Sequence, residues 1–299
     1  MGQVFLTAPI EGQITWNISY LDVTNGTNFG FDDPVFGASR RATLEAAADY
    51  AVSRFDHSGT IDVEVQLSEN NLSSLLASAG AFRYSTVNFG FQNGLAFEHA
   101  TTGVDASSSF PDGTLMFNFG RTWNSEMDSP TASEFDLFSV AIHEFGHVFG
   151  LTSHLDQSGG STIAEGNYSV FDSFLKDGAG NSLFTAGAQF VGTPADLTGG
   201  DLFFAGANAM AANGGQPVEV YVPATFSQGT SIAHVDPAMN VIMNPTISAG
   251  VEQRTYDEIE WAIFQDLGYT VLTPVPEPSV VLLGGFFLSG FLLQRRRVG

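Results

Sequence analysis

Two histidines four residues apart, His143 and His147, constrain this chain more than any other feature, because Glu144 directly follows the first of them. Apolar residues recur at helical spacing through the surrounding segment, so we predict a helix over Phe135–Leu151. On a helix, positions i and i+4 share a face, and both imidazole rings can then reach one ion. The fold must therefore bury one side of this helix and open the other side onto a site.

These residue types at this spacing predict a hydrolytic zinc centre. Neutral imidazole is a good zinc ligand, and a catalytic zinc site keeps one coordination position open for water. Glu144 lies beside the first ligand and is expected to act as general base, taking a proton from that water and passing it to the leaving amine. Gly150, three residues after His147, is expected to let the chain turn sharply out of the helix, and Asp136 is placed to cap its start.

The run Asp136–Leu151 resembles the metzincin metalloproteases, whose extended motif is His-Glu-x-x-His-x-x-Gly-x-x-His, and it is close in sequence to the matrixins. The third histidine of that motif would fall at Ser153, and His154 comes one residue later. Two alternatives follow from this departure. A one-residue insertion in the turn would still bring His154 to the metal, whereas a leishmanolysin-like arrangement would place the third ligand far downstream.

A downstream segment favours the second alternative. Ser231–Pro237 contains His234, and Asn240–Thr246, which follows it, contains Met243. This order resembles the leishmanolysin-like pairing of a distant histidine with a methionine-containing turn. The resemblance implies that His234 is the third zinc ligand and that Met243 lies under the metal, with His154 as the alternative third ligand.

The resemblance covers Phe36–Tyr269 and implies an α+β fold of the metzincin-like zincin type. In that fold a twisted mixed sheet and the active-site helix accompany an irregular C-terminal subdomain. Leu115–Phe119 resembles the strand that edges the substrate cleft in this family, where the strand backbone pairs with an extended peptide. The resemblance therefore implies a zinc-dependent endopeptidase with a protein or peptide substrate. The alternative is a non-catalytic surface or extracellular matrix protein that retains a metalloprotease-like fold.

Hydrophobic periodicity predicts the remaining elements, with alternation indicating strands and apolar stripes at helical spacing indicating helices. Residues 70–113 are expected to form loops and short strands, and residues 152–250 mostly turns. His57 and His99 lie in polar surroundings and are expected to be surface histidines without a role. The predicted strands are Ile14–Tyr20, Ile61–Leu67, Leu115–Phe119 and Val218–Val222, and the other predicted helices are Ala38–Phe55, Ser169–Lys176 and Tyr256–Leu267.

The charge of the chain is strongly negative. The net charge is −22, and up to Thr273 the chain has 31 acidic residues against 7 basic ones. Such a surface repels phosphates, which disfavours a nucleic-acid partner. The acidity either keeps the protein solvated or provides calcium sites in acidic loops such as Asp32–Asp33. The chain has no cysteine, which excludes disulfides, thiol catalysis and cysteine-ligated zinc.

Residues 273–299 form a distinct tail, which leaves residues 1–272 as the expected catalytic domain. The tail has a proline-rich linker, the apolar stretch Val280–Leu293 and three arginines at positions 295–297. These elements in this order resemble the PEP-CTERM sorting signal of Gram-negative bacteria. The resemblance implies export, transient membrane anchoring by the C-terminal segment, processing by an exosortase-type enzyme, and delivery to the envelope, outer surface or extracellular matrix. Met1–Pro9 lacks a signal-peptide pattern, so we expect the natural start to differ.

Overall fold

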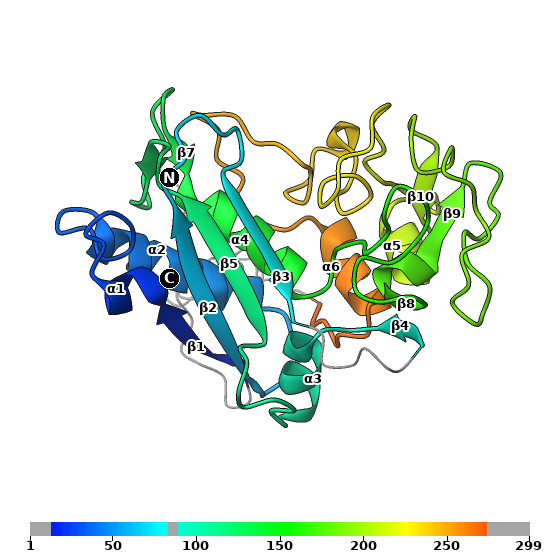
Figure 1. The fold of residues 1–299 in the computed structure, drawn as a ribbon, viewed down its shortest axis with the longest axis horizontal. Coiled ribbons are helices and arrows are strands. Elements are labelled where there is room, and N and C mark those ends of the chain that lie inside the picture. Colours follow the sequence, from blue (N-terminus) through cyan, green and yellow to red (C-terminus); the bar gives the residue numbers. More distant parts are fainter. Residues whose placement is uncertain (1–12, 83–88, 274–299) are drawn as a thin grey trace, which may run out of the picture.

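The computed structural model describes residues 13–82 and 89–273, and Figure 1 shows their arrangement. A four-stranded sheet and the longer helices occupy one half of the molecule, and short elements joined by irregular segments occupy the other. This confirms the predicted α+β class with a mixed sheet. The predicted sorting tail, residues 273–299, lies outside the described residues except for Thr273. Within the described ranges, no helix is both long and apolar enough to cross a membrane.

The main sheet has the strand order β1-β2-β5-β3. Strands β1, β2 and β5 run parallel, and β3 is antiparallel to β5 at one edge. Alternating apolar residues predict β1, β2 and β5 within a few residues of their observed bounds. These bounds are Thr15–Tyr20 for β1, Thr60–Ser68 for β2, Ala77–Ala81 for β3 and Gly113–Asn118 for β5.

The edge of the sheet corrects one expectation from the sequence. Leu115–Phe119 does not edge a cleft, because β5 lies inside the sheet between β2 and β3. Its residues Leu115 and Phe117 are fully buried core residues. The edge strand is β3, whose sequence is Ala-Ser-Ala-Gly-Ala. Such small residues give no alternation of large apolar and polar side chains, so the strand has no periodic signal.

Helices α2 and α4 pack against each other behind the sheet (Figure 1). Their apolar faces and the inward side chains of β2 and β5 form the core of this half, where Leu44, Val65 and Phe145 are completely buried. The predicted helix Phe135–Leu151 is shorter than expected because Phe135–Asp136 pairs as the short strand β7 with β6, Trp123–Asn124. The observed helices are α1 (Leu21–Asn25), α2 (Gly37–Ala51), α3 (Leu95–Thr102), α4 (Leu137–Val148), α5 (Ala207–Ala212) and α6 (Glu258–Asp266).

Helix α3 falls in residues 70–113, where only loops and short strands were expected, so that expectation is incomplete. The helix lies between Gly94 and Gly103, which form its N-cap and C-cap. Its eight residues make about two turns, too few for an apolar stripe to stand out from the Gly- and Ser-rich neighbourhood.

The irregular half contains a small antiparallel sheet of β9 (Leu175–Asp177), β10 (Leu202–Phe204) and β11 (Val218–Glu219). Strand β8 (Asn167–Ser169) pairs with β4 (Gly90–Gln92), which comes from the other half. The final predicted helix is confirmed as α6, which packs on α5.

The predicted helix Ser169–Lys176 is wrong. The chain forms β8, a 3-10 helix over Phe171–Phe174 and then β9. The carboxylate of the buried Asp172 accepts the backbone N–H of Ser169 at 2.9 Å and that of His154 at 3.1 Å. Such local side-chain bonds offer the backbone an alternative to helical hydrogen bonds.

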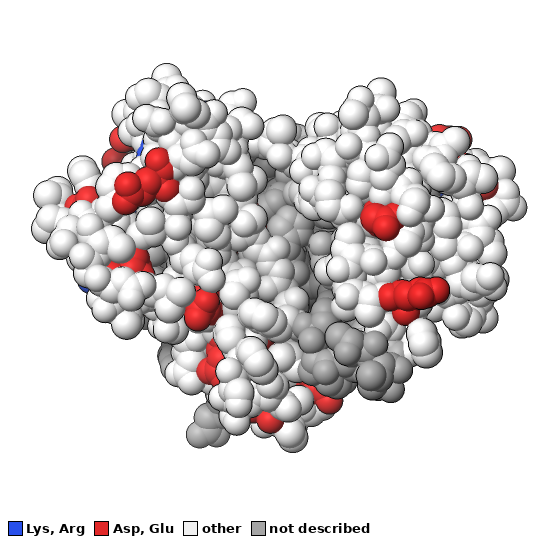
Figure 2. Space-filling model, in the orientation of Figure 1, with Lys and Arg blue, Asp and Glu red and all other residues white. Residues whose placement is uncertain are grey.

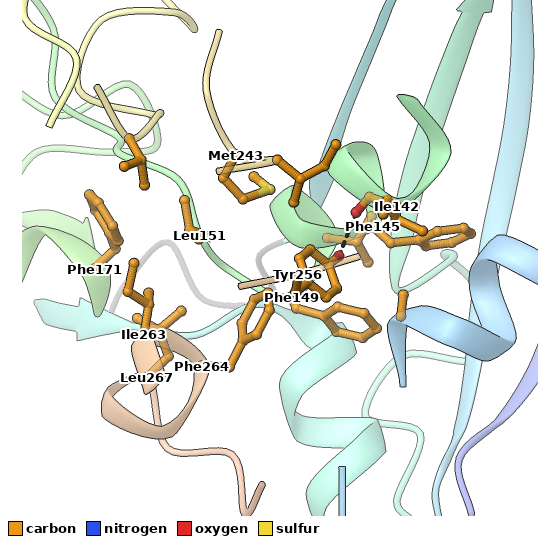
Figure 3. Close-up of a cluster of buried hydrophobic side chains, with 14 of the residues drawn as sticks. Ile142, Phe145, Phe149, Leu151, Phe171, Met243, Tyr256, Ile263, Phe264 and Leu267 are labelled. Atoms are coloured by element: carbon orange, nitrogen blue, oxygen red, sulfur yellow. Dashed lines mark hydrogen bonds between the residues drawn. The ribbon is translucent and has the colours of Figure 1, made fainter. Parts of the chain in front are cut away.

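One apolar cluster joins the two halves. Figure 3 shows side chains of α4, α6 and the segment around Met243 directed toward one another. Phe149 of α4's C-terminal turn lies 6.1 Å from Phe264 of α6, measured between ring centroids, with an interplanar angle of 86°. Met243 and Phe264 are both completely buried. The irregular half is therefore anchored to the helix that bears the two histidines.

Candidate metal centre

Three histidines meet at one point where the two halves join. His143 and His147 lie on successive turns of α4, and His234 comes from the irregular half. The Nε2 atom of His147 lies 3.1 Å from Nε2 of His143 and 3.2 Å from Nε2 of His234. The structure thus brings together the helical pair and the distant histidine that the sequence suggests as a ligand set.

A backbone carbonyl orients each of the three imidazole rings. A carbonyl oxygen only accepts hydrogen bonds, so each Nδ1 donates a proton and each Nε2 keeps its lone pair. Three lone pairs directed at one point repel one another unless a cation lies among them. The distance from Nδ1 to the carbonyl oxygen is 2.8 Å in all three cases: His143 to Ile242, His147 to Leu151, and His234 to Thr230.

The protonation state of the histidines fits metal binding. Burial lowers the pKa of His143, lowers that of His147 well below the usual value, and lowers that of His234 to about 3. Repulsion from neighbouring histidines adds to the effect at His147 and His234. The rings are therefore neutral at pH 7, which is the form that ligates metals. Three neutral nitrogen donors at one point suit a zinc ion that keeps a fourth position for water.

Glu144 lies on the same helix and is only 4% exposed. Its Oε2 atom is buried and has no hydrogen-bond partner among the described residues. Burial raises the pKa of this carboxyl to about 8. Leaving a buried polar atom unpaired is costly, and such groups concentrate at functional sites. Glu144 directly follows His143, so a buried carboxyl with one unpaired oxygen comes from the same helix as two of the three nitrogen donors.

Residues 86–168 match the family model described as Matrixin. The matched segment contains β5, α4 and the two helical histidines, while His234 lies beyond it. The match supports a metzincin-type metalloprotease, zinc as its metal and, in general terms, a zinc metalloendopeptidase. No curated protein matches the chain.

Met243 packs against α4 at the turn between the two helical histidines (Figure 3). A β-carbon at Gly146 would collide with Met243 Sδ, so the approach requires glycine there. The Met243 carbonyl accepts the N–H of Val235 at 2.9 Å, next to His234. The methionine-containing turn therefore packs against α4 at Gly146, between His143 and His147. It is also hydrogen-bonded to Val235, the residue that follows His234.

His154, the alternative third ligand, is not part of the histidine group in the described structure. Its ring Nδ1 lies 3.3 Å from Thr162 Oγ1, and its backbone N–H is held by the buried Asp172. Gly150 has a φ of 95°, so the chain leaves α4 in a conformation that favours glycine, as expected. The turn after α4 directs the chain toward Asp172, and the histidine that lies with His143 and His147 is His234.

His99 is not a surface histidine as expected, because it is 7% exposed. Its Nδ1 lies 2.8 Å from Asp112 Oδ2, and the backbone N–H of Asp62 donates to the same oxygen at 2.8 Å. Asp62, His99 and Asp112 are close enough to hold a metal ion. The Asp112 oxygen already accepts two N–H groups, however. We therefore interpret these three residues as a hydrogen-bonded link between His99 of α3 and Asp62 of strand β2. His57 is half-buried and accepts the N–H of Thr270 at 2.9 Å.

The carboxylates of Asp32 and Asp33, named above as a candidate calcium site, accept hydrogen bonds from the backbone. Asp32 accepts the N–H of Phe29 at 3.0 Å, and Asp33 accepts those of Val35 and Phe36. These bonds lower the pKa of both carboxyls. Among the described residues, this loop contains no group of three metal-binding side chains, so calcium here stays a prediction.

Arg254 and Glu260, which the sequence does not single out, support the elements that carry the site. Asp136 caps α4 as expected, accepting the N–H of Ser139 at 3.0 Å, but it is also completely buried against Arg254. The guanidinium of Arg254 contacts both oxygens of Asp136, at 2.6 and 3.0 Å. Glu260, also completely buried, accepts the N–H of Met243 at 2.6 Å. Only the Asp257-x-x-Glu260 spacing, typical of a capping box, could have drawn attention to Glu260.

Proposed function

We propose that this protein is a zinc-dependent endopeptidase in which His143, His147 and His234 hold the metal and Glu144 is the general base. One observation carries the proposal: three Nε2 atoms converge on one point, and Glu144, which directly follows the first of these histidines on α4, has a buried carboxyl oxygen with no partner among the described residues. This donor set with a free proton acceptor suits amide hydrolysis better than a purely structural metal, which needs no base.

The residues of the chain supply binding, orientation and proton transfer. When bound, zinc supplies a Lewis acid that polarises the scissile carbonyl and acidifies water. The carbonyls of Ile242, Leu151 and Thr230 fix the ring orientations, so the three nitrogens need not rearrange. Glu144 accepts one proton from the attacking water and delivers it to the amide nitrogen as the C–N bond breaks. The products are a carboxylic acid and an amine, and the acid then passes its proton to the amine or to solvent.

An extended peptide suits the outer edge of β3, which pairs with no other strand among the described residues. Asn118 N–H bonds to Leu76 O and Phe82 N–H bonds to Asp112 O, both at 2.8 Å, so even-numbered residues of this segment face β5. By alternation, Ala77, Ala79 and Ala81 direct their N–H and C=O groups to the free edge. Figures 1 and 2 show that β3 faces a groove between the two halves. A peptide strand added there would lie in that groove.

The cellular setting belongs to the same proposal. The order of Val275–Ser279, the apolar stretch and the arginines supports export, transient membrane anchoring and processing by an exosortase-type enzyme. The mature protein would then act on proteins of the envelope, outer surface or extracellular matrix. Figure 2 shows acidic side chains on both halves and very few basic ones on this face, which supports a partner other than nucleic acid.

The first test is elemental analysis of zinc in the purified wild type, His234→Ala and His154→Ala. We expect one zinc per chain in the wild type and in His154→Ala, and its loss in His234→Ala. Loss in His154→Ala alone would overturn the ligand set, and absence of zinc from the wild type would remove the basis of the proposal.

The second test is peptide hydrolysis by Glu144→Gln. This variant keeps the ligands, so zinc content should be unchanged while kcat falls by about 10²–10⁴-fold, the usual contribution of a general base. Zinc retention with no proteolysis in the wild type would instead indicate a non-catalytic surface or matrix protein that keeps the fold.

A further inference from the structure

The outer face of the sheet has a hollow beside the edge strand β3. Its volume is about 500 Å³, and its lining includes Gln66, Ser78, Gly80, Phe82, Thr114 and Met116. These residues all come from β2, β5 and the β3 segment, so the hollow spans three neighbouring strands. It lies on the face opposite α2 and α4, because the alternate residues Leu115 and Phe117 are buried.

Small residues create this hollow. Gly80 stands opposite Thr114, and Ser78 stands opposite Met116 in the antiparallel register. Residues directly opposite one another point to the same face, so Gly80 and Ser78 also face outward. Apart from the two chain neighbours, no described residue would lie within 4 Å of a β-carbon at Gly80. Glycine at this position is therefore not required by the packing of the protein itself, and its φ is not positive.

A peptide paired with the free edge of β3 would direct every second side chain toward the hollow. Its backbone would bond to Ala79 and Ala81, which leaves a peptide residue directly opposite Gly80 in a non-hydrogen-bonded pair. In such antiparallel pairs the Cα atoms lie about 4.5 Å apart and the side chains are close. Because Gly80 has no side chain, a large side chain of the peptide can lean across it.

We propose that this hollow is a specificity pocket for one large aromatic side chain of the bound peptide. Gly80 lies at its entrance and leaves the entrance unobstructed because it has no side chain. The proposal rests on the proposed endopeptidase function. Phe82 is 38% exposed and provides an aromatic wall, and the Met116 thioether provides a favourable contact for a ring. Ser78 and Thr114 line the same hollow, and their hydroxyl groups can hydrogen-bond a phenolic hydroxyl. Tyrosine matches this combination best.

The test compares cleavage of peptides that carry tyrosine or alanine at each position around the scissile bond, using the wild type and Gly80→Phe. We expect the wild type to favour tyrosine at one position by about 10-fold or more in kcat/KM. The phenylalanine side chain should fill the hollow and reduce this preference to about twofold or less, mainly by slowing cleavage of the tyrosine peptide.

Asn17→Phe is the matched control, because Asn17 is exposed on the same sheet face but on β1 at the opposite edge. It should retain the wild-type preference. Ser78→Phe is a second variant that blocks the same hollow if Gly80→Phe lowers Tm. Unchanged preference at every position in both blocking variants would overturn the pocket while leaving the endopeptidase proposal intact. A wild type that cleaves no peptide would overturn both.

Discussion

Both halves of the molecule bury large aromatic side chains completely, but they do so with secondary-structure elements of very different length. In the sheet half, α2 has 15 residues, α4 has 12 and β2 has 9, whereas in the irregular half the strands have two or three residues. Phe145 and Phe204, one from each half, are nevertheless both completely buried. Buried side chains and side-chain-to-backbone bonds can therefore position a functional residue as well as long regular elements do.

The proposed zinc site depends on both modes of construction. α4 fixes His143 and His147 through helical geometry, so their relative position follows from the spacing alone. His234 is fixed through bridging backbone bonds: its carbonyl accepts the N–H of Tyr221 at 2.9 Å, and its ring is held by Thr230. A substitution in either half can therefore disturb the three-histidine arrangement, and substitutions confined to one half distinguish the two contributions.

The largest expected effect comes from removing one buried phenylalanine side chain from the core of each half. Phe145→Ala and Phe204→Ala should each lower the free energy of unfolding by about 3–5 kcal/mol, the usual cost of removing a fully buried phenylalanine. Phe145 packs 4.8 Å from Trp16, and Phe204 packs 4.8 Å from Phe171, measured between ring centroids. Urea titration followed by far- and near-UV circular dichroism measures the change. A cost below about 1 kcal/mol at Phe204 would mean that the irregular half is loosely packed.

The next effect tests the ion pair that ties the irregular half to the start of α4. Arg254→Met leaves the buried Asp136 carboxylate without its charged partner and should cost about 3 kcal/mol. Arg254 also donates to the carbonyls of Met127 and Asp128. The control is Glu252→Gln, which removes an exposed partner 3.7 Å from the same guanidinium and should change stability by about 0.5 kcal/mol or less. Equal effects of the two substitutions would contradict the assignment.

The same contrast explains how much could be predicted from sequence. Strands β1, β2 and β5 have alternating apolar residues, and helices α2, α4 and α6 have apolar residues at helical spacing, so both kinds of element could be predicted. Strand β3 and helix α3 lacked that signal, since one consists of Ala, Ser and Gly and the other has only eight residues. The spacing of His143 and His147 predicted a shared face, and the structure brings their Nε2 atoms to 3.1 Å from each other.

Contacts between distant positions could not be predicted in this way. Asp136 and Arg254 are 118 positions apart, and nothing in either local pattern indicates the other. Asp136 was correctly expected to cap a helix, but its burial against arginine depends on the tertiary fold. His234 and Met243 came from a family resemblance, because spacing alone does not relate residue 147 to residue 234.

A third prediction concerns pH and the carboxyl that supports the methionine turn. Burial raises the pKa of Glu260 to about 8, although its oxygens accept the N–H groups of Met243 and Asp257. A raised folded-state pKa contributes stability that is complete below the usual value of 4.5 and is lost as pH rises through 8. Metal-free wild type should therefore lose about 2 kcal/mol or more between pH 6 and pH 9.

Glu260→Gln isolates this effect. Glu144 has a similarly raised pKa, so the substitution should remove about half of the decline with pH while lowering stability near pH 6 by about 1–2 kcal/mol. Chemical denaturation in the presence of a chelator, at several pH values, measures both changes. Glu258→Gln, which alters the 64% exposed neighbour, should leave the slope unchanged. A wild-type curve that is flat between pH 6 and pH 9 would show that Glu260 is ionised throughout.

The smallest expected effect lies at the contact between the halves, where Met243 meets Gly146. Replacing glycine by alanine inside a helix usually stabilises it by about 1 kcal/mol. Here the new methyl group would strike Met243 Sδ, and Met243 is completely buried and has little room to move. Gly146→Ala should therefore destabilise the protein, by about 1 kcal/mol.

A double-mutant cycle decides whether that contact is the cause. In a Met243→Ala background the sulfur is absent, so Gly146→Ala should become neutral or stabilising, with a coupling energy of about 1–2 kcal/mol. Urea denaturation of the four proteins measures this coupling. A coupling near zero would mean that the methionine turn and α4 are positioned independently. Zinc affinity would then depend on the two halves separately, and the site would be held together by the metal and not by the contact beneath it.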